Sequence, residues 1–345
     1  MSSSWTRTGL KYAALLAPTA FLAALVALVA LGAAVTGVLR DPEHFDDASE
    51  LVRKLTKAVY WHTRRHWHTV PECVLFDPEL LYRPRPGSCL FENAEFSTTM
   101  HFDAQGARVT PLPAPAADDE SSMPRVVIVG DSHAMGWGVQ DQETFASVLA
   151  RDYSYRTVNL AVSSYGTPRE LLRLRRDFTL APGDIVVIQY CDNDFAENRQ
   201  FAGSGERRRY EPAELQALLD YRPARVSPLP VAGVILRLAW KDAIDAVRRG
   251  FDESDTATDA TSAFLKVLEA HAELEGHPVL VVAINGPGLG THLDEVRLAA
   301  AGLPLLVPQL SQDEFLDIDD HMRPRGHRAV AAALDAAIRG RGRAR

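Results

Sequence analysis

Apolar positions follow three different patterns along the chain. Residues 12–39 contain no charged side chain and are rich in Ala, Leu and Val, and about 20 such residues suffice for a helix that spans a bilayer. Residues 43–69 carry apolar side chains at helical spacing, which predicts an amphipathic helix. From Arg125 onward, short β-branched runs alternate with helix-period segments. Such alternation predicts a mostly parallel sheet with helices on both faces.

The C-terminal part divides into individual strands and helices. The strand-like runs are 126–129, 157–160, 185–189, 279–283 and 303–307. The helical patterns cover about 140–151, 168–177, 210–220, 262–274, 293–301 and 324–339. Residues 199–261 interrupt the alternation with an apolar stripe at helical spacing, formed by Val231, Val234, Ile235 and Leu238. This stripe fits a core-facing helix, a lid over a site, or an element that lies on a membrane.

The region before Arg125 has a different composition. Residues 70–112 are broken by prolines into short segments and predict a small β-rich lead-in, and residues 111–124 form a polar, proline-rich linker. Cys73 and Cys89 lie close together in the lead-in. We expect them to pair as a disulfide if this part of the chain is outside the cytoplasm.

The charges around the first apolar segment predict its orientation. Arg7 and Lys11 precede it, whereas residues of mixed sign follow. The positive-inside bias places residues 1–11 in the cytoplasm, 12–39 across the membrane and the rest on the extracytoplasmic side, as a single-pass protein of the cell membrane. A cleaved signal peptide is the alternative, with 32–34 (GAA) as the candidate cleavage region. The run exceeds a typical signal-peptide core of roughly 7–15 residues, which favours an uncleaved anchor.

Composition and charge narrow the choice of partners. A chain of 345 residues with 46% hydrophobic residues supports one large or two modest globular domains. The net charge of −8 argues against general nucleic-acid binding. Three histidines cluster in residues 61–68, but no Cys, Asp or Glu with ligand spacing accompanies them. We therefore expect this cluster beside lipid head groups rather than around a metal.

The polar residues that follow the predicted strands suggest nucleophilic chemistry. Ser132 comes directly after the run 126–131 (VVIVGD), at a predicted strand-to-helix turn, where its own N–H can point at an oxyanion. Asn193 follows the third strand, and His321 precedes the last helix after aspartates at positions 317, 319 and 320. A nucleophilic serine needs a base, the base needs an acid partner, and the developing oxyanion needs donors. The loop after the second strand can supply a further backbone N–H.

These segments together resemble the sequence blocks of the SGNH/GDSL hydrolase superfamily. Residues 130–133 (GDSH) resemble block I, 159–167 block II, 191–194 (CDND) block III and 319–321 (DDH) block V. The resemblance covers about 125–340. It implies that residues 125–345 form a flavodoxin-like three-layer α/β/α sandwich with about five parallel strands. The transmembrane helix precedes this domain, and residues 40–124 between them comprise the juxtamembrane helix, the β-rich lead-in and the linker.

The resemblance also implies site residues. Ser132 is the nucleophile and His321 the base, with Asp319 as its partner and the aspartates at 317 and 320 left open. The oxyanion hole takes the N–H groups of Ser132 and Ser164 and the amide of Asn193. Ser164 stands where block II has a glycine, so its backbone must suit a residue with a Cβ; Gly166 is the fallback donor. Cys191 replaces the block III glycine and is expected to be a buried free thiol rather than a nucleophile.

The implied function is that of a serine esterase or deacylase. Its substrates would be ester-linked acyl groups of cell-envelope glycans or lipids, processed through an acyl-enzyme without metal or organic cofactor. An O-acyltransferase that modifies an exported polysaccharide would use the same residues. A non-catalytic glycan-binding or assembly protein on the same fold is the third alternative.

Overall fold

Contacts within the chain divide it into two units in this computed structural model, which describes residues 3–111, 124–205, 208–248 and 259–343. The helical unit comprises Met1–Arg64 and Arg222–Asp255, and the α/β unit comprises Arg65–Tyr221 and Thr256–Arg345. The lead-in therefore belongs with the α/β region. The segment 222–255, expected within the 125–345 domain, belongs instead with the helices at the start of the chain.

A five-stranded parallel sheet forms the centre of the α/β unit. Its order is β6-β5-β7-β8-β9. The strands are β5 (Arg125–Val129), β6 (Arg156–Asn159), β7 (Ile185–Tyr190), β8 (Val279–Ala283) and β9 (Leu305–Leu306). Numbered within the sheet this order is 2-1-3-4-5, the flavodoxin-like order, in which ligands bind where the order reverses beside the first strand. All five predicted strands form, and the last is shorter than expected.

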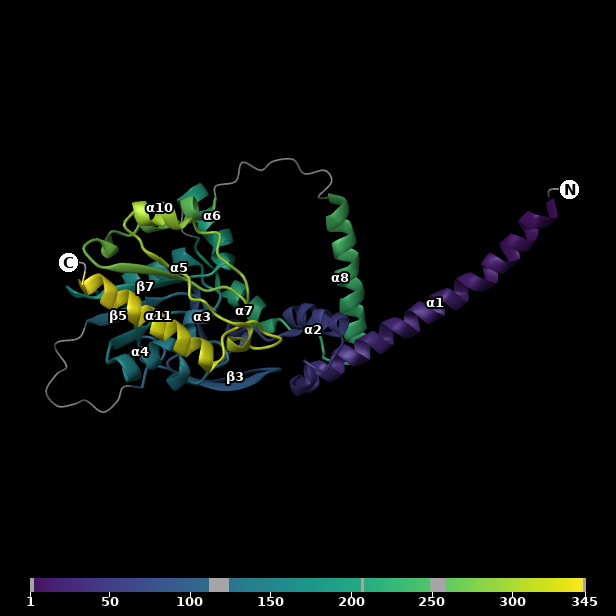
Figure 1. The fold of residues 1–345 in the computed structure, drawn as a ribbon, viewed down its shortest axis with the longest axis horizontal. Helices are drawn as coiled ribbons and strands as arrows, with labels where there is room; N and C mark the ends of the chain where they lie inside the picture. Colours follow the sequence, from purple (N-terminus) through teal and green to yellow (C-terminus); the bar gives the residue numbers. More distant parts are fainter. Residues whose placement is uncertain (1–2, 112–123, 206–207, 249–258, 344–345) are drawn as a thin grey trace. The chain divides into compact units, whose positions relative to one another are not determined.

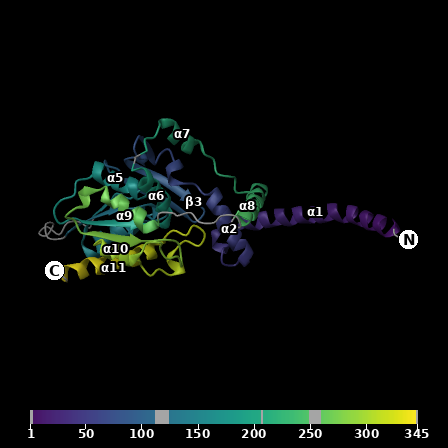
Figure 2. The ribbon, with the colours of Figure 1, turned by 90° about the horizontal axis from the view of Figure 1, so that it is seen from above.

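Helices cover both faces of this sheet (Figures 1 and 2). One face packs with α4 (Phe145–Tyr153) and α11 (Pro324–Arg343). The other packs with α5 (Thr167–Asp177), α9 (Ala260–Glu269) and α10 (Glu295–Ala300). In β5, Val126 and Ile128 belong to the first core and Val127 to the second, because successive strand residues point to opposite faces. The predicted three-layer α/β/α class is confirmed.

The lead-in consists of two antiparallel hairpins. They pair β1 (Val74–Asp77) with β2 (Leu81–Pro84), and β3 (Gly87–Asn93) with β4 (Phe96–Phe102). The predicted disulfide joins Cys73 and Cys89, with their Cα atoms 5.2 Å apart. Apolar residues of β3 and β4 share the core that α4 and α11 cover. The lead-in is therefore an integral part of the α/β unit.

The remaining described elements are helices. In the α/β unit these are α3 (Ser132–Met135), α6 (Phe195–Ser204) and α7 (Pro212–Asp220). The helical unit contains α1 (Ser3–Arg40), α2 (Glu50–Thr63) and α8 (Pro228–Arg248). Within α1, Pro18–Arg40 has a mean hydropathy of 2.5 and is long enough to cross a membrane. By length and composition it fits either an anchor or a signal sequence.

Candidate active site

The turn after β5 is held by a glutamine from the neighbouring strand. Gln189 Oε1 accepts the backbone N–H groups of Asp131 and Ala134, each at 3.1 Å. A Cβ on Gly130 would lie 2.7 Å from the same oxygen and 2.8 Å from the Ala134 side chain. Only glycine fits this close approach. The turn therefore presents Ser132 as the first residue of α3, at the carboxyl end of β5.

Ser132, His321 and Asp319 form a continuous hydrogen-bonded chain. Ser132 Oγ lies 2.8 Å from His321 Nε2, and His321 Nδ1 contacts Asp319 Oδ1. The other carboxylate oxygen of Asp319 accepts the indole N–H of Trp137 at 3.0 Å. All three members of the chain are buried. A carboxylate on Nδ1 favours the tautomer that carries its proton there, which leaves Nε2 as the acceptor that faces the serine.

The structure distinguishes between the three aspartates that precede the histidine. Asp319 contacts the imidazole, whereas the Asp317 carboxylate pairs with Arg323. Asp320 has a φ of +62°, in the left-handed region that aspartate tolerates better than most residues. This turn lies between Asp319 and His321, so it allows residues two positions apart to face one another.

Two aromatic rings stack on the His321 imidazole. The Trp137 ring has its centroid 4.7 Å away at an interplanar angle of 15°, and the His133 ring lies 4.7 Å away at 29°. Both residues follow Ser132 closely in the chain. The segment that carries the serine therefore also fixes the plane of the imidazole beside it.

The expected oxyanion donors lie on three loops at the same edge of the sheet. Ser164 has a φ of +64°, the left-handed conformation that a glycine would adopt without strain. The Asn193 amide donates to Asp131 Oδ2 at 3.2 Å. Gly166, the fallback donor, directs its N–H to Glu197 Oε2 at 3.0 Å and is thereby occupied. Asp131, which holds Asn193, is fully buried, and burial raises the pKa of its carboxyl.

Cys191 has the properties of an inert thiol. Its Sγ contacts Asn285 Oδ1 at 3.1 Å, and the residue is buried. Burial raises the pKa of the Cys191 thiol, and the nearby carboxylate of Asp131 raises it further. The thiolate needed for nucleophilic attack is therefore disfavoured.

Glu95, at the tip of the β3–β4 hairpin, is a site residue that the sequence pattern did not single out. Its carboxylate accepts three consecutive backbone N–H groups: Asp317 at 2.7 Å, Ile318 at 2.9 Å and Asp319 at 2.7 Å. Burial raises the pKa of Glu95 to about 7, with a smaller contribution from the charge of Asp319, while the N–H groups oppose the shift. Glu95 thus holds the loop that carries the acid partner of His321.

Arg108, which follows β4, supports the other side of the site. Its guanidinium is buried and donates to the carbonyl oxygens of Met135 at 2.7 Å and Val139 at 2.6 Å. It also donates to Asp141 Oδ1 at 3.0 Å. These contacts fix the segment that follows Ser132. The lead-in therefore braces both halves of the Ser–His–Asp arrangement, although no local motif marks either Glu95 or Arg108.

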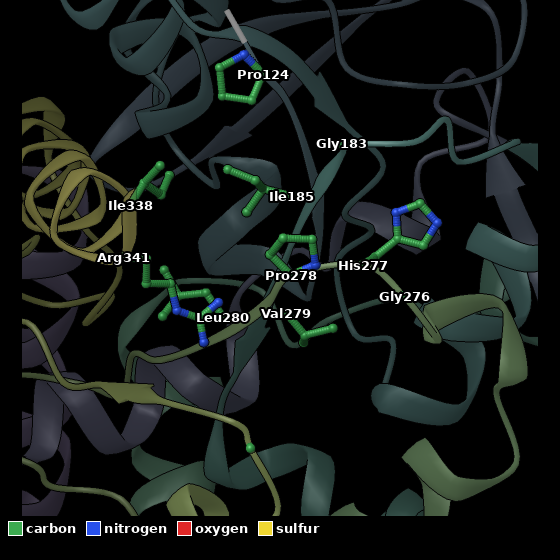
Figure 3. A pocket seen from close by; sticks show the side chains of 11 residues that line it. Pro124, Gly183, Ile185, Gly276, His277, Pro278, Val279, Leu280, Ile338 and Arg341 are labelled. Atoms are coloured by element: carbon green, nitrogen blue, oxygen red, sulfur yellow. The ribbon is translucent and has the colours of Figure 1, made fainter. Parts of the chain in front are cut away.

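Two cavities lie at opposite ends of the strands of the sheet. One of about 760 Å³ is lined by Ile185, Pro278 and Ile338 among others (Figure 3), at the amino ends of β7 and β8 and away from Ser132. Another of about 230 Å³ is formed by the loops after β8 and β9. Gly286 in its wall would place a Cβ 3.6 Å from that of Asp320. The smaller cavity therefore adjoins the loop that carries His321.

Within the described ranges, no group of three or more His, Cys, Asp or Glu side chains is arranged to hold a metal ion. The Ser132 hydroxyl pairs with His321 Nε2, and the Asn193 amide pairs with Asp131 Oδ2.

Comparison with known proteins finds solved structures that are similar to this chain. No protein-family model and no curated protein matches the chain. A protein from Desulfitobacterium hafniense, described as a lipolytic member of the G-D-S-L family, is 11% identical at a TM-score of 0.36, over 61% of this chain and 97% of that one. A family two carbohydrate esterase from Clostridium thermocellum is 15% identical at 0.34, over 68% and 67%. A carbohydrate esterase family 2 enzyme from Corynascus thermopiles is 16% identical at 0.36, over 68% and 69%.

Proposed function

We propose that this chain is a serine ester hydrolase that works through an acyl-enzyme. The observation that carries the proposal is the 2.8 Å contact between Ser132 Oγ and His321 Nε2, continued through Nδ1 to Asp319. A serine hydroxyl gains nucleophilicity when a neighbouring imidazole accepts its proton. The carboxylate of Asp319 keeps Nε2 unprotonated and stabilises the imidazolium that forms.

In the acylation step, Ser132 Oγ attacks the ester carbonyl as its proton passes to His321 Nε2. The tetrahedral intermediate places a negative charge on the former carbonyl oxygen. The backbone N–H groups of Ser132 and Ser164 and the Asn193 amide stabilise this oxygen. The left-handed backbone of Ser164 and the hydrogen bond from Asn193 to Asp131 support these assignments, since both hold the donors in place.

The intermediate then collapses, and the proton on His321 passes to the leaving alcohol. The acyl group remains on Ser132 until a second hydroxyl attacks. His321 removes the proton of that incoming group and returns it to Ser132. Water as the incoming group gives an esterase, whereas a sugar hydroxyl gives an O-acyltransferase with the same residues.

Two features support a substrate in the cell envelope, such as an acylated glycan or a lipid ester. Pro18–Arg40 is apolar and long enough to span a membrane. The chain contains a disulfide between Cys73 and Cys89, and disulfides persist mainly in oxidising compartments outside the cytoplasm. A membrane-bound enzyme with its α/β unit on the extracytoplasmic side would meet such esters directly.

The test measures release of p-nitrophenol from p-nitrophenyl acetate by the full chain in detergent. Ser132→Ala is compared with Ser88→Ala, an exposed serine on β3. We expect a loss of about 10⁴-fold or more in kcat for Ser132→Ala and none for the control. Turnover that rises with added oligosaccharide, together with acetylated sugar, assigns the transferase reaction. Equal rates for the two variants would remove Ser132 as the nucleophile.

A further inference from the structure

Helix α8 packs closely on the C-terminal part of α1 within the helical unit. Its buried face is formed by Val231, Val234 and Ile235. A Cβ on Gly32 of α1 would lie 2.5 Å from the carbonyl oxygen of Pro228 and 3.0 Å from the Ala232 side chain. Such close approach at small residues is typical of helix pairs in membranes. Figures 1 and 2 show α8 where it meets this part of α1.

The opposite face of α8 is also apolar, and the described residues leave it uncovered. Leu229, Leu236 and Trp240 are 69%, 59% and 70% exposed, and at 100° per residue they form one stripe opposite the buried face. The helix of a water-soluble unit would carry polar residues on that stripe. Arg237 and Lys241 are exposed and lie on one flank between the two faces.

A second uncovered apolar surface belongs to the same unit. Phe21, Leu22 and Val26 of α1 are 72%, 59% and 61% exposed, whereas Val35 and Leu39, nearer its C-terminal end, are buried. Among the residues of α1 whose side chains are described, those nearer the C-terminal end are the covered ones, where α8 and α2 pack on the helix. Lipid is the environment that satisfies the uncovered parts of both helices.

We propose that α8 lies in the bilayer beside α1, with its Leu229–Leu236–Trp240 face in contact with lipid at the head-group boundary. Tryptophan favours that boundary. Arg237 and Lys241 can extend their charged ends to the head groups while their aliphatic parts remain among the acyl chains. Two helices of the helical unit, α1 and α8, therefore contact the membrane, and the second contact comes from a segment about 200 positions further along the chain.

The same packing argues that α1 is retained in the mature protein. The candidate cleavage region begins at Gly32, which lies against Pro228 and Ala232. Cleavage there would divide the α1–α8 contact and leave the face of Val231 and Ile235 without part of its apolar partner. The proposal thus distinguishes an anchor from a signal peptide, and it is independent of the ester chemistry.

Quenching of Trp240 fluorescence by brominated lipid tests the proposal. The full chain and Trp240→Phe are reconstituted in vesicles of phosphatidylcholine and phosphatidylglycerol, with or without bromine on the acyl chains. The difference between the two proteins isolates the emission of Trp240. We expect brominated lipid to remove most of that emission and aqueous acrylamide to remove little. Quenching by acrylamide but not by brominated lipid would overturn the proposal.

A matched pair of glycines in α1 tests whether α1 positions α8. Gly32→Val introduces a side chain against Pro228, whereas a Cβ on Gly37 meets nothing within 4 Å. We expect Gly32→Val to reduce the lipid quenching of Trp240 and Gly37→Val to preserve it; equal quenching in both would refute the contact. An intact N-terminus, found by mass spectrometry of protein from membranes, is the expected accompanying result. A chain that begins near residue 35 would overturn retention.

Discussion

Glu95→Gln tests whether the lead-in hairpin takes part in catalysis. The wild-type carboxylate accepts three backbone N–H groups from the 317–319 loop. Glutamine keeps one acceptor oxygen and turns an NH₂ group toward at least one of those donors. A hydrogen bond to a charged group contributes about 1.5–3 kcal/mol. If that loss falls on the transition state, kcat decreases by about 10- to 100-fold.

The pH dependence separates this role from a merely structural one. With a pKa of about 7, Glu95 protonates as the pH falls below neutrality, and its carboxyl then competes poorly for the three N–H groups. The acid limb of kcat/KM in the wild type therefore contains the ionisation of Glu95. Glu95→Gln removes this ionisation, so the limb becomes shallower while KM stays unchanged.

The contribution of Glu95 to the free energy of unfolding decreases as the pH rises, whereas its contribution to activity increases. The folded pKa of Glu95 lies above its ordinary value of 4.5, so its contribution to folding is fully present below about pH 4.5 and is lost as the pH rises through about 7. This dependence should be absent from Glu95→Gln. The control is Glu92→Gln, an exposed residue of the same hairpin that accepts from Ser97 at 2.7 Å. An unchanged kcat and an equally steep acid limb in Glu95→Gln would refute the role.

Three further predictions follow from the site. Asp319→Asn should lower kcat about 10⁴-fold by favouring the wrong imidazole tautomer, whereas Asp317→Asn should stay near wild type in the p-nitrophenyl acetate assay; equal losses would contradict the pairing. Asn193→Ala should lower kcat by about 10²–10³-fold with little change in KM, and a pure KM effect would argue against an oxyanion role. Arg108→Met leaves the buried Asp141 with its contact to His101 but without the guanidinium, so urea unfolding should show a loss of about 3–5 kcal/mol; a loss below about 1 kcal/mol would contradict its bracing role.

The central strands could be predicted because burial on both faces leaves a strong sequence signal. The run at Val126–Val129 is apolar throughout, since α4 and α11 cover one face and α5 and α9 the other. The turn at Ser132 could be predicted because a glycine and an aspartate end that strand. The residues of β9, the last strand, are only partly buried. The prediction overestimated the length of this strand.

The long-range contacts of the site left no such signal. Glu95 lies more than 220 positions before the loop that it holds, and nothing in its neighbourhood on the hairpin marks it as a site residue. The apolar stripe of Val231 and Ile235 fitted a core-facing helix best, with a lid or a membrane element as alternatives, because spacing gives a helix its face but not its partner. In the structure the main partner is α1, with a smaller contact from α2. Gly166 is not available as the fallback donor because its N–H bonds to Glu197, which lies on a helix beyond the next strand. The sequence around Gly166 does not show this contact.

Covalent labelling of Ser132 is the most direct test of the central claim. The full chain is treated with a fluorophosphonate, digested and analysed by mass spectrometry, alongside Ser132→Ala and His321→Ala. We predict a single phosphonylated serine at position 132 in the wild type, no adduct in Ser132→Ala, and labelling of Ser132 slowed by orders of magnitude in His321→Ala. An unlabelled wild type, or labelling at the same rate without His321, would contradict the account.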